Sequence, residues 1–372
     1  MAALTEEQSI LKDQASSWVE TQLPVQKFRE FRNSNSDGGF DPQAWSAMVE
    51  MGWTGILVPE AYGGSDLGYL TFGLILEQLG RQLCASPLFA SAYVGATAVN
   101  LGGSDAQKQA WLPKIVDGSE ILTLAGDEQS RHNRQGVETT AQANDQGYLL
   151  NGAKTFVLEG MSATTLIVAA RADDGHIGLF LVPAATQGLD RHRMLTLDSR
   201  DYARVTLSGV QVGVDSRLDA MSGSELYEKV LDRAAAGIAM EMLGVGCYAF
   251  EMTLDYLKTR KQFGQVIGSF QALGHRAAEL YSAQEMARSC AEAGIAAIDE
   301  AASDEAAMSA LSKAKTGEFL FDMSNQLIQI HGGIGMTDEF DAGLYLKRAR
   351  VLETTFGNQA QHRDRYATLL GF

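Results

Sequence analysis

The sequence has few cysteines and too little positive charge for several classes of protein. Its three cysteines, Cys84, Cys247 and Cys290, lie far apart among 372 residues, without a CxxC pair or a cysteine–histidine spacing that suits zinc. We therefore expect no metal site and a reducing compartment. The 30 basic and 46 acidic residues give a formal net charge of −16, which argues against a general nucleic-acid binder or a protein that binds anionic membranes.

Long apolar runs are missing as well. No stretch reaches the roughly 18 residues of a membrane-spanning helix, and the first residues, MAALTEEQ, are acidic where a signal peptide is cationic. We expect a cytoplasmic protein without a membrane span. Hydrophobic residues make up 45% and charged residues 20% of the chain, which is typical of globular proteins, and the length suits two or three domains.

The hydrophobic pattern changes twice along the chain and predicts helical, β and helical segments in that order. The first 118 residues repeat apolar positions at helical spacing, at 4–32, 69–82, 90–101 and 105–117. Residues 119–218 show short alternating or apolar runs separated by turn signals such as Asn144-Asp145-Gln146-Gly147. These short strands predict an antiparallel barrel or sandwich.

Helical spacing returns in the last part of the chain, in four long, alanine-rich stretches at 224–259, 271–300, 304–330 and 340–369. Long helices joined by short loops favour an antiparallel four-helix bundle. We therefore expect three domains: an N-terminal helical domain at 1–118, a middle β domain at 119–218 and a C-terminal helical bundle at 219–372.

The usual nucleotide-binding and hydrolase motifs are absent. There is no GxGxxG after a predicted strand, no GxxxxGK followed by Ser or Thr, and no GxSxG. A Rossmann site, a P-loop and a nucleophile elbow therefore have no support. The net acidity still allows an anionic small ligand, because such a ligand needs only a local group of basic residues.

One basic segment of the last domain offers such a group. Lys258, Arg260 and Lys261 lie at the expected end of a long helix, just before Gly264. Basic residues suit a helix C-terminus and glycine lets the chain turn, so one interpretation is a structural corner with a solvated basic end, as most such corners are. The other interpretation is a local positive site for a pyrophosphate, a role that suits the planar fork of arginine.

A second segment, Gln329-Ile330-His331-Gly332-Gly333-Ile334-Gly335, places three glycines in four positions after a long helix. Glycines there allow the backbone to approach a ligand or another chain closely, although a helix cap followed by a loop has the same composition. His331 alone is better explained as a packed or capping histidine than as a catalyst.

Together the two segments resemble the acyl-CoA dehydrogenase family, whose members carry an RxQFG…FQ corner and a QxxGGxG loop. The resemblance covers nearly the whole chain, since Pro59-Glu60-Ala61-Tyr62-Gly63-Gly64 is similar to the family's PExxGG turn and Asn151-Gly152-Ala153-Lys154 to its NGxK strand entry. It implies a tetramer with FAD between subunits, which oxidises the Cα–Cβ bond of an acyl-CoA thioester. A glutamate removes the α-proton, the β-hydrogen leaves as hydride, and an electron-transfer flavoprotein is the usual electron acceptor.

The resemblance fails at the catalytic base. A weakly acidic α-proton needs an ionised carboxylate held against it in a dry pocket. The family usually carries this glutamate in a YEGTxxIQ segment of the last helix, where the present chain has Phe356-Gly357-Asn358. Some members place it early in the helix that leads to RxQFG, where the present chain has Ala234. Neither Phe356 nor Ala234 can accept a proton.

The residues that the family turns toward a subunit's own flavin are also altered. The segment 154–160 stands where the family has KxWITNG; we count its Phe156 among the cofactor-binding residues, whereas the flavin-bonding threonine has become Leu158. The TEPxxGSD loop is hard to recognise in residues 122–128. The threonine and glutamine that follow the base are Asn358 and Ala360.

The residues that the family lends to a neighbouring subunit's FAD are kept. They are Arg260, Gln262, Phe263, Gln271, Gln329, Gly332 and Gly333. A degenerate homotetramer has no reason to lose only one of the two sets. The pattern therefore predicts a partner subunit that completes FAD sites on a catalytic homologue. It resembles the short, non-catalytic halves of heteromeric acyl-CoA dehydrogenases, some of which act on steroid side-chain thioesters.

The alternative is a self-sufficient homo-oligomer in which the base has moved to Glu241 or Glu353. Glu353 precedes Phe356 by one helical turn, and Glu241 follows Ala234 by seven residues on one helix face. Structural carboxylates outnumber catalytic ones: Glu353 also fits a surface group near Arg350, and Glu241 a buried carboxylate satisfied by an arginine. A helical binding protein without flavin is disfavoured, because the corner and the glycine loop persist together.

Overall fold

The computed structural model describes residues 4–34 and 39–372. The chain forms two compact units, each assembled from separate stretches of sequence. We call Met1–Arg29, Gly73–Cys84 and Ala235–Phe372 the helical unit, and Glu30–Phe72 with Ala85–Ala234 the sheet unit. Over the described residues, no helix is both long and apolar enough to cross a bilayer.

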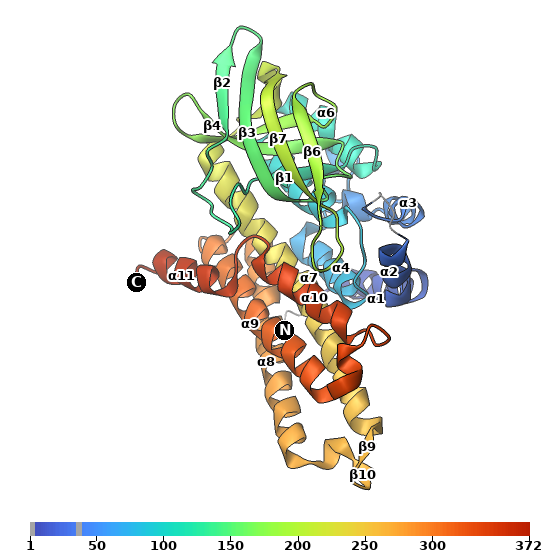
Figure 1. Ribbon diagram of the computed structural model, residues 1–372. Coiled ribbons are helices and arrows are strands. Elements are labelled where there is room, and N and C mark those ends of the chain that lie inside the picture. The colour runs from blue at the N-terminus through green and yellow to red at the C-terminus, as the bar shows by residue number, and fades with distance from the viewer. Residues whose placement is uncertain (1–3, 35–38) are drawn as a thin grey trace. The chain divides into compact units, whose positions relative to one another are not determined.

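The sheet unit is built on one sheet of eight strands, in the order β6-β7-β3-β2-β4-β5-β8 with β1 paired to β4. The strands are β1 (Leu122–Ala125), β2 (Thr140–Asn144), β3 (Gly147–Leu158), β4 (Thr165–Ala172), β5 (Ile177–Pro183), β6 (Leu189–Met194), β7 (Tyr202–Val212) and β8 (Arg217–Leu218). Figure 1 shows β3, β7 and β6 side by side. The alternation of apolar residues along β7 places Ala203, Val205 and Leu207 in a buried core.

The sheet differs from the expected barrel or sandwich in two respects. It is not closed in the described chain, because the strand order ends at β6 and β8. It is also mixed, since β1 and β2 each pair with β4 in parallel while the other neighbours are antiparallel. Two parallel neighbours cannot be joined by a tight hairpin, so the chain between β1 or β2 and β4 must cross over before it pairs. The edge strand β6 carries Asp190, Arg191, His192 and Arg193, and such charge discourages pairing with another chain.

Short helices accompany the sheet in this unit. They are α3 (Pro42–Glu50), the 3-10 turns η1 (Trp53–Gly55), η2 (Glu60–Tyr62) and η4 (Val214–Ser216), the π-helical η3 (Phe89–Gly95), α5 (Ala96–Gly102) and α6 (Asp105–Val116). Asp41 caps α3 through the N–H of Gln43, and Pro42 occupies its first turn. The stretch 90–101, predicted as one helix, thus begins as a π-helix and continues as α5.

The helical unit contains α1 (Glu6–Gln22), α8 (Gln271–Asp299), α9 (Glu305–His331), α10 (Ala342–Thr354) and α11 (Gln359–Leu369). It also contains parts of α2 (Val25–Asn33), α4 (Gly68–Arg81) and α7 (Gly223–Thr259), whose other residues belong to the sheet unit. In Figure 1, α8 and α9 run side by side, joined by a short loop. The small elements β9 (Lys261–Gln262), β10 (Gln265–Val266), η5 (Ile267–Ser269) and η6 (Gly332–Met336) complete the unit.

Two stretches that were expected as single helices are each broken in two. The helix predicted at 4–32 stops at Leu23, because Pro24 lacks an N–H and disfavours helical geometry in the residue before it. The helix predicted at 340–369 is interrupted between Thr354 and Gln359. There Phe356 and Gly357 both have positive φ, +56° and +101°, which no α-helix accommodates.

Glycine permits a very close approach of α4 and α7 within the helical unit. A Cβ atom at Gly244 would lie 1.9 Å from the carbonyl oxygen of Glu77, and one at Gly80 would lie 2.3 Å from that of Glu241. The two backbones therefore touch where any side chain would separate them. This crossing fixes the position of Glu241 along α7 in the packed interior.

Candidate functional site

The basic corner at the end of α7 is an exposed two-stranded turn. Gln262 of β9 pairs with Gln265 of β10, and the N–H of Ile267 bonds to the carbonyl of Arg260 at 2.8 Å. Phe263 and Gly264 at the tip have φ of +52° and +80°. Phe263 is 91% exposed, and its ring meets Phe270 edge-on at 6.3 Å. The tip of the turn therefore exposes a large apolar ring beside the basic residues of the corner.

The glycine loop follows the end of α9. Gly332 has φ +61° and ψ −134°, a backbone conformation open essentially only to glycine. Gln329, Gly332 and Gly333 are all exposed, and nothing lies within 4 Å of a Cβ built at either glycine. The loop therefore offers bare backbone to its surroundings.

An aromatic stack joins the corner to the glycine loop. The His331 ring lies between Tyr256 and Phe340, with centroids 4.3 and 4.8 Å away. Tyr256 is in the last turns of α7, and its hydroxyl bonds to the His331 carbonyl at 3.5 Å. Below the stack, Leu257, Ile267 and Ile330 form a small buried cluster. The two segments that the sequence analysis singled out are thus brought together by packing.

His331 is a packed residue in this arrangement. It is buried, and its Nδ1 bonds to the carbonyl of Leu327 at 2.7 Å, so Nδ1 carries the proton. Burial lowers the pKa of His331, and this hydrogen bond opposes the effect. The geometry agrees with the structural interpretation of His331 and gives it no catalytic role.

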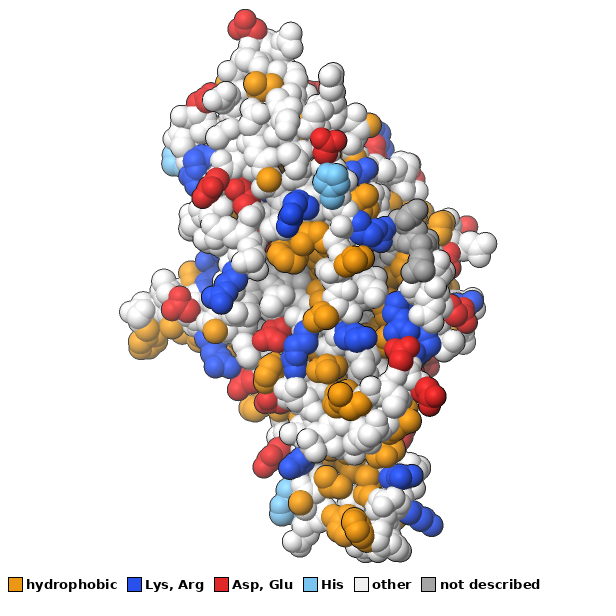
Figure 2. Space-filling model, in the orientation of Figure 1, with side chains coloured by type: hydrophobic (Ala, Val, Ile, Leu, Met, Phe, Trp, Pro, Cys, Tyr) orange, Lys and Arg blue, Asp and Glu red, His pale blue; other side chains and the backbone are white. Residues whose placement is uncertain are grey.

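Positive charge gathers at the same end of the helical unit. Lys258, Arg260 and Lys261 are exposed, and none of them forms an ion pair with another residue of the described chain. Figure 2 shows lysine and arginine side chains beside surface hydrophobic groups around β9 and β10. Cations that are not neutralised beside bare glycine backbone can hold an anion such as a pyrophosphate. Gln271, the first residue of α8, is exposed nearby in sequence.

Phe356, the residue expected at the position of the family's base, lies in the connection between α10 and α11. Phe356 is half-buried there, and its carbonyl accepts a hydrogen bond from His362 Nε2 at 2.8 Å. Glu353, one turn earlier, is half-buried and lies 3.5 Å from Arg350. The second position, Ala234, is 1% exposed in α7 within the sheet unit. Neither Phe356 nor Ala234 has a side chain that can accept a proton.

Glu241 faces a guanidinium in the helical unit. Its Oε1 accepts hydrogen bonds from Arg348 Nε at 3.1 Å and Nη2 at 2.6 Å, and both residues are buried. This is the arginine-satisfied carboxylate that the sequence analysis named as the structural explanation. The partner comes from α10, 107 residues away in the chain.

The sheet unit has a cavity of about 260 Å³ beside Phe156. Its lining includes Glu128, Lys154, Thr155, Phe156, Met194 and Arg204. Phe156 itself is 43% exposed with φ +51°, and its N–H approaches Met194 Sδ at 3.4 Å. The cavity combines an aromatic and a thioether surface with cationic side chains.

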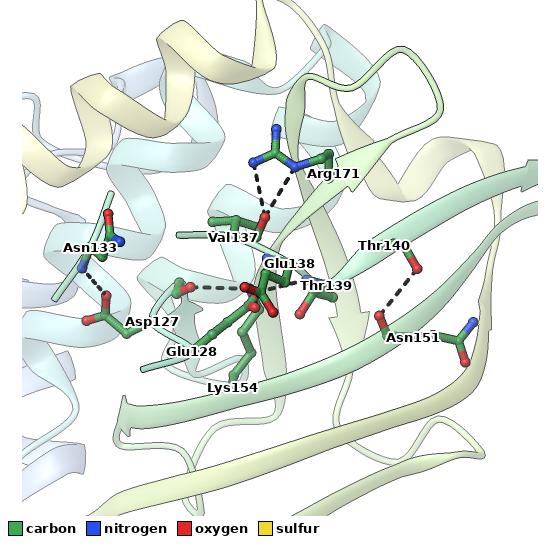
Figure 3. Close-up of polar contacts among 11 residues, drawn as sticks. Asp127, Glu128, Asn133, Val137, Glu138, Thr139, Thr140, Asn151, Lys154 and Arg171 are labelled. Atoms are coloured by element: carbon green, nitrogen blue, oxygen red, sulfur yellow. Dashed lines mark hydrogen bonds and ion pairs between the residues drawn. The ribbon is translucent and has the colours of Figure 1, made fainter. Parts of the chain in front are cut away.

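A buried ion pair supports one side of this cavity (Figure 3). Lys154 Nζ lies 2.6 Å from Glu128 Oε1 and 3.2 Å from the Gly126 carbonyl. Glu128 also accepts the N–H groups of Glu138 and Thr139 at 2.8 and 3.0 Å. Burial lowers the pKa of Lys154, and the negative charge of Glu128 opposes this effect. Burial alone would raise the pKa of Glu128, but the ion pair with Lys154 holds that pKa below its usual value.

Further charges anchor the loop between β1 and β2. His132 Nδ1 lies 2.9 Å from Asp127, and Arg134 reaches α7, with contacts of 2.9 Å to Glu228 and 2.8 Å to Asp232. No sequence signal predicts this network, because its partners are separated by up to about a hundred residues and follow no motif. The loop thus directs many of its polar groups to other parts of the same chain.

No group of three or more His, Cys, Asp or Glu in residues 4–34 and 39–372 is placed to hold a metal ion.

Comparison with known proteins identifies the family. Three family models match in succession: acyl-CoA dehydrogenase N-terminal domain over residues 5–119, middle domain over 123–210 and C-terminal domain over 221–370. The probable acyl-CoA dehydrogenase YngJ of Bacillus subtilis is 28% identical over 374 aligned residues, covering 97% of each chain.

Solved structures agree over the full length. A steroid acyl-CoA dehydrogenase variant of the Tcur3481–Tcur3483 pair is 29% identical, with a TM-score of 0.90 and 98% of each chain covered. The ChsE4–ChsE5 complex from Mycobacterium tuberculosis is 26% identical, with a TM-score of 0.91 and 99% and 98% of the two chains covered. The order of helices and sheet and all three domain matches lead to one conclusion: the chain belongs to the acyl-CoA dehydrogenase family.

Proposed function

We propose that this chain is a partner subunit of a heteromeric, FAD-dependent acyl-CoA dehydrogenase. In this role it completes the FAD sites of a homologous catalytic chain, and the assembled complex oxidises the Cα–Cβ bond of an acyl-CoA thioester. The observation that carries the proposal is an asymmetry. The corner and the glycine loop are packed together and exposed, whereas both base positions hold hydrocarbon side chains.

The chemistry requires a group that this chain does not place at the usual positions. Removing an α-proton from a thioester calls for an ionised carboxylate. Phe356 and Ala234 offer none, and Glu241 is held by Arg348. The proton must therefore be taken by a residue of another subunit if this chain is a partner.

The corner fits the anionic half of FAD. Arg260 is exposed with a guanidinium suited to a pyrophosphate, and the bare backbone of Gly332 and Gly333 allows close approach. Phe263 provides a large apolar surface beside these groups. FAD supplies the hydride acceptor for the β-hydrogen when it is bound. The residues of this chain would bind and orient it, and Tyr256 and His331 would hold the two binding segments in register.

The internal ion pairs of the sheet unit support the view that this chain does not hold a flavin by itself. The loop between β1 and β2 is tied down by Lys154–Glu128, by Arg134–Asp232 and by Asp127–His132. Leu158 cannot replace the hydrogen-bonding threonine that the family resemblance assigns to this strand. These contacts support a site that has been converted to internal structure.

The relatives indicate which partner and substrate to test. The ChsE4–ChsE5 structure is a complex of two differently named chains, and the Tcur3481–Tcur3483 protein is described as a steroid acyl-CoA dehydrogenase. We propose a homologous acyl-CoA dehydrogenase chain as the partner, a tetramer as the assembly, and an electron-transfer flavoprotein as the electron acceptor. A steroid side-chain thioester and a fatty acyl-CoA are the two substrate classes to compare.

The decisive experiment measures flavin per subunit. The chain is purified alone and after co-expression with an acyl-CoA dehydrogenase homologue encoded beside it. We expect a colourless, inactive chain alone, and a yellow, active complex with one FAD for every two subunits. Full flavin occupancy and turnover from this chain alone would exclude the partner role.

The second candidate function is a self-sufficient homo-oligomer with a relocated base. Glu353 is the observation in its favour, because it is half-buried one turn before Phe356 and its contact with Arg350 is loose at 3.5 Å. Glu353→Gln separates the two functions. It should abolish turnover of a self-sufficient enzyme and leave that of a heteromeric complex unchanged.

A further inference from the structure

A fully buried lysine sits beneath the connection between α10 and α11. Lys313 lies on α9 and is 0% exposed. Its Nζ lies 3.0 Å from the carbonyl oxygen of Leu352, 3.1 Å from that of Glu353 and 2.9 Å from that of Gly357. Three backbone carbonyls from both sides of the connection therefore converge on one side chain.

In its ammonium form a lysine has three donors and no acceptor, so the three carbonyls match its full hydrogen-bonding capacity, and in its neutral form it still donates two hydrogen bonds. Leu352 and Glu353 belong to the last turn of α10, whose carbonyls have no partner within the helix. A cation there also complements the negative end of the helix dipole. The third carbonyl, on Gly357, lies at the far end of the connection, just before Asn358 caps α11, so Lys313 ties the end of α10 to the residue that precedes this cap.

The rest of the connection is held by backbone contacts as well. The N–H of Thr355 bonds to the carbonyl of Val351 at 3.2 Å, and that of Gly357 to the carbonyl of Thr354 at 3.2 Å. The carbonyl of Phe356 accepts from buried His362. These bonds hold Phe356 at a φ of +56°, which a bulky side chain rarely adopts and which costs energy.

We infer that Lys313 is a positioning residue that holds the loop 354–357 in a fixed shape and so presents residue 356 at the site where the family carries its base. The inference rests on contacts within this chain, so it stands whether or not the chain is a partner subunit. Burying an ammonium is expensive unless all its donors are satisfied. A methionine would fill the same space without that cost, which indicates that the hydrogen bonds to the loop are what the lysine provides.

The neighbouring Lys315 offers a matched control. It lies on the same helix two residues later, is partly exposed and pairs with Glu318 at 2.7 Å. Lys313→Met and Lys315→Met are compared by hydrogen exchange with mass spectrometry on peptides covering 352–362. In Lys313→Met we expect the amides of Thr355 and Gly357 to exchange at least tenfold faster, while peptides of α8 and α9 change less than threefold. Lys315→Met should leave the loop unchanged, and Lys313→Arg should recover part of the protection.

Two outcomes would overturn the inference. One is an unchanged amide exchange rate of the loop in Lys313→Met. The other is an equal rise in exchange rate throughout the helical unit, which would mean that Lys313 has only a general packing role. The unmodified chain gives a test that does not depend on the variant folding. Its Thr355 and Gly357 amides should exchange as slowly as those in the middle of α9, and near-unprotected exchange there would exclude a clamp.

Discussion

Arg348 donates two hydrogen bonds to one carboxylate oxygen of Glu241, from Nε at 3.1 Å and Nη2 at 2.6 Å, in the interior of the helical unit. Hydrogen bonds between a guanidinium and a carboxylate are among the stronger ones in proteins, so each residue satisfies the other in the interior. The pair also explains why α7 tolerates a glutamate in an otherwise apolar run. It favours a structural over a catalytic role for Glu241.

The first prediction concerns the stability of this pair. Glu241→Gln leaves the Arg348 guanidinium buried without its counter-ion, and we expect a loss of about 3–5 kcal/mol in the free energy of unfolding. Exchanging both residues for methionine should recover most of that loss, because no unpaired charge remains. Urea denaturation of the three variants measures both effects. A Glu241→Gln protein of normal stability that has lost turnover would instead identify Glu241 as the base.

The second prediction tests the basic corner in the co-expressed complex. Arg260→Ala should lower the fraction of FAD retained after gel filtration by at least tenfold, because it removes the proposed pyrophosphate contact. Turnover per bound flavin should stay within twofold of the original, since the proposed function places the base in the partner chain. Lys229→Ala is the control, because it also removes one positive charge, from a half-buried residue of α7 paired with Glu225. Equal flavin retention in both variants would exclude the corner as a cofactor site.

The third prediction concerns Phe356. In the complex, Phe356→Leu should change turnover less than twofold, since in the proposed partner role residue 356 of this chain removes no proton. Phe356→Glu in the isolated chain should remain inactive, because on the same proposal this chain does not bind a flavin by itself. Steady-state assays with an artificial electron acceptor measure both. Turnover by the isolated Phe356→Glu chain would show that its flavin site is intact.

The fourth prediction follows from the titration of Lys313. Burial lowers its pKa to about 7, opposed by Glu353. Between pH 7 and about 10 the unfolded chain holds a proton that the folded chain lacks, so this group makes the free energy of unfolding rise with pH. Relative to Lys313→Met, the unmodified chain should gain about 1 kcal/mol per pH unit between pH 7 and 9. Urea denaturation at pH 7, 8 and 9 tests this.

The comparison with Lys313→Met isolates the contribution of this lysine to the pH dependence. Glu353 and His362, on the two helices that the loop connects, are present in both proteins. Parallel curves of unfolding free energy against pH would mean that Lys313 keeps its proton throughout. Its three carbonyl partners and the helix dipole would then outweigh the effect of burial.

The order of helical, β and helical segments is predictable from the sequence, because periods of 3.6 and 2 are local properties. Whether a sheet closes into a barrel depends on contacts between distant segments, and so does the parallel pairing of β1 and β2 with β4. Neither could be predicted from local patterns. Local chemistry also explains the break at Pro24 in hindsight. The break at Phe356 also has local signals, because Gly357 and the capping residue Asn358 follow it. The hydrogen bonds of this connection to Lys313 and His362 cannot be read locally.

The candidate site shows the same division. The corner and the glycine loop form motifs of a few consecutive residues, so they were recognisable, and packing of His331 on Tyr256 brings them together. The partners of Glu241 and Lys154 are distant in sequence and were not recognisable individually. Lys313 sits in a helical pattern where a lysine suggests a solvated face. Only the fold shows that this position is interior.

The contacts that hold the loop 354–357 affect which substitutions the sequence can accept during evolution. Lys313 and His362 bind main-chain carbonyls, and none of these hydrogen bonds uses the side chain of residue 356. An exchange of the side chain at position 356 therefore removes none of these hydrogen bonds. On the proposed function, this is how a duplicated gene can lose a catalytic side chain here and still encode a subunit that assembles with its active relative.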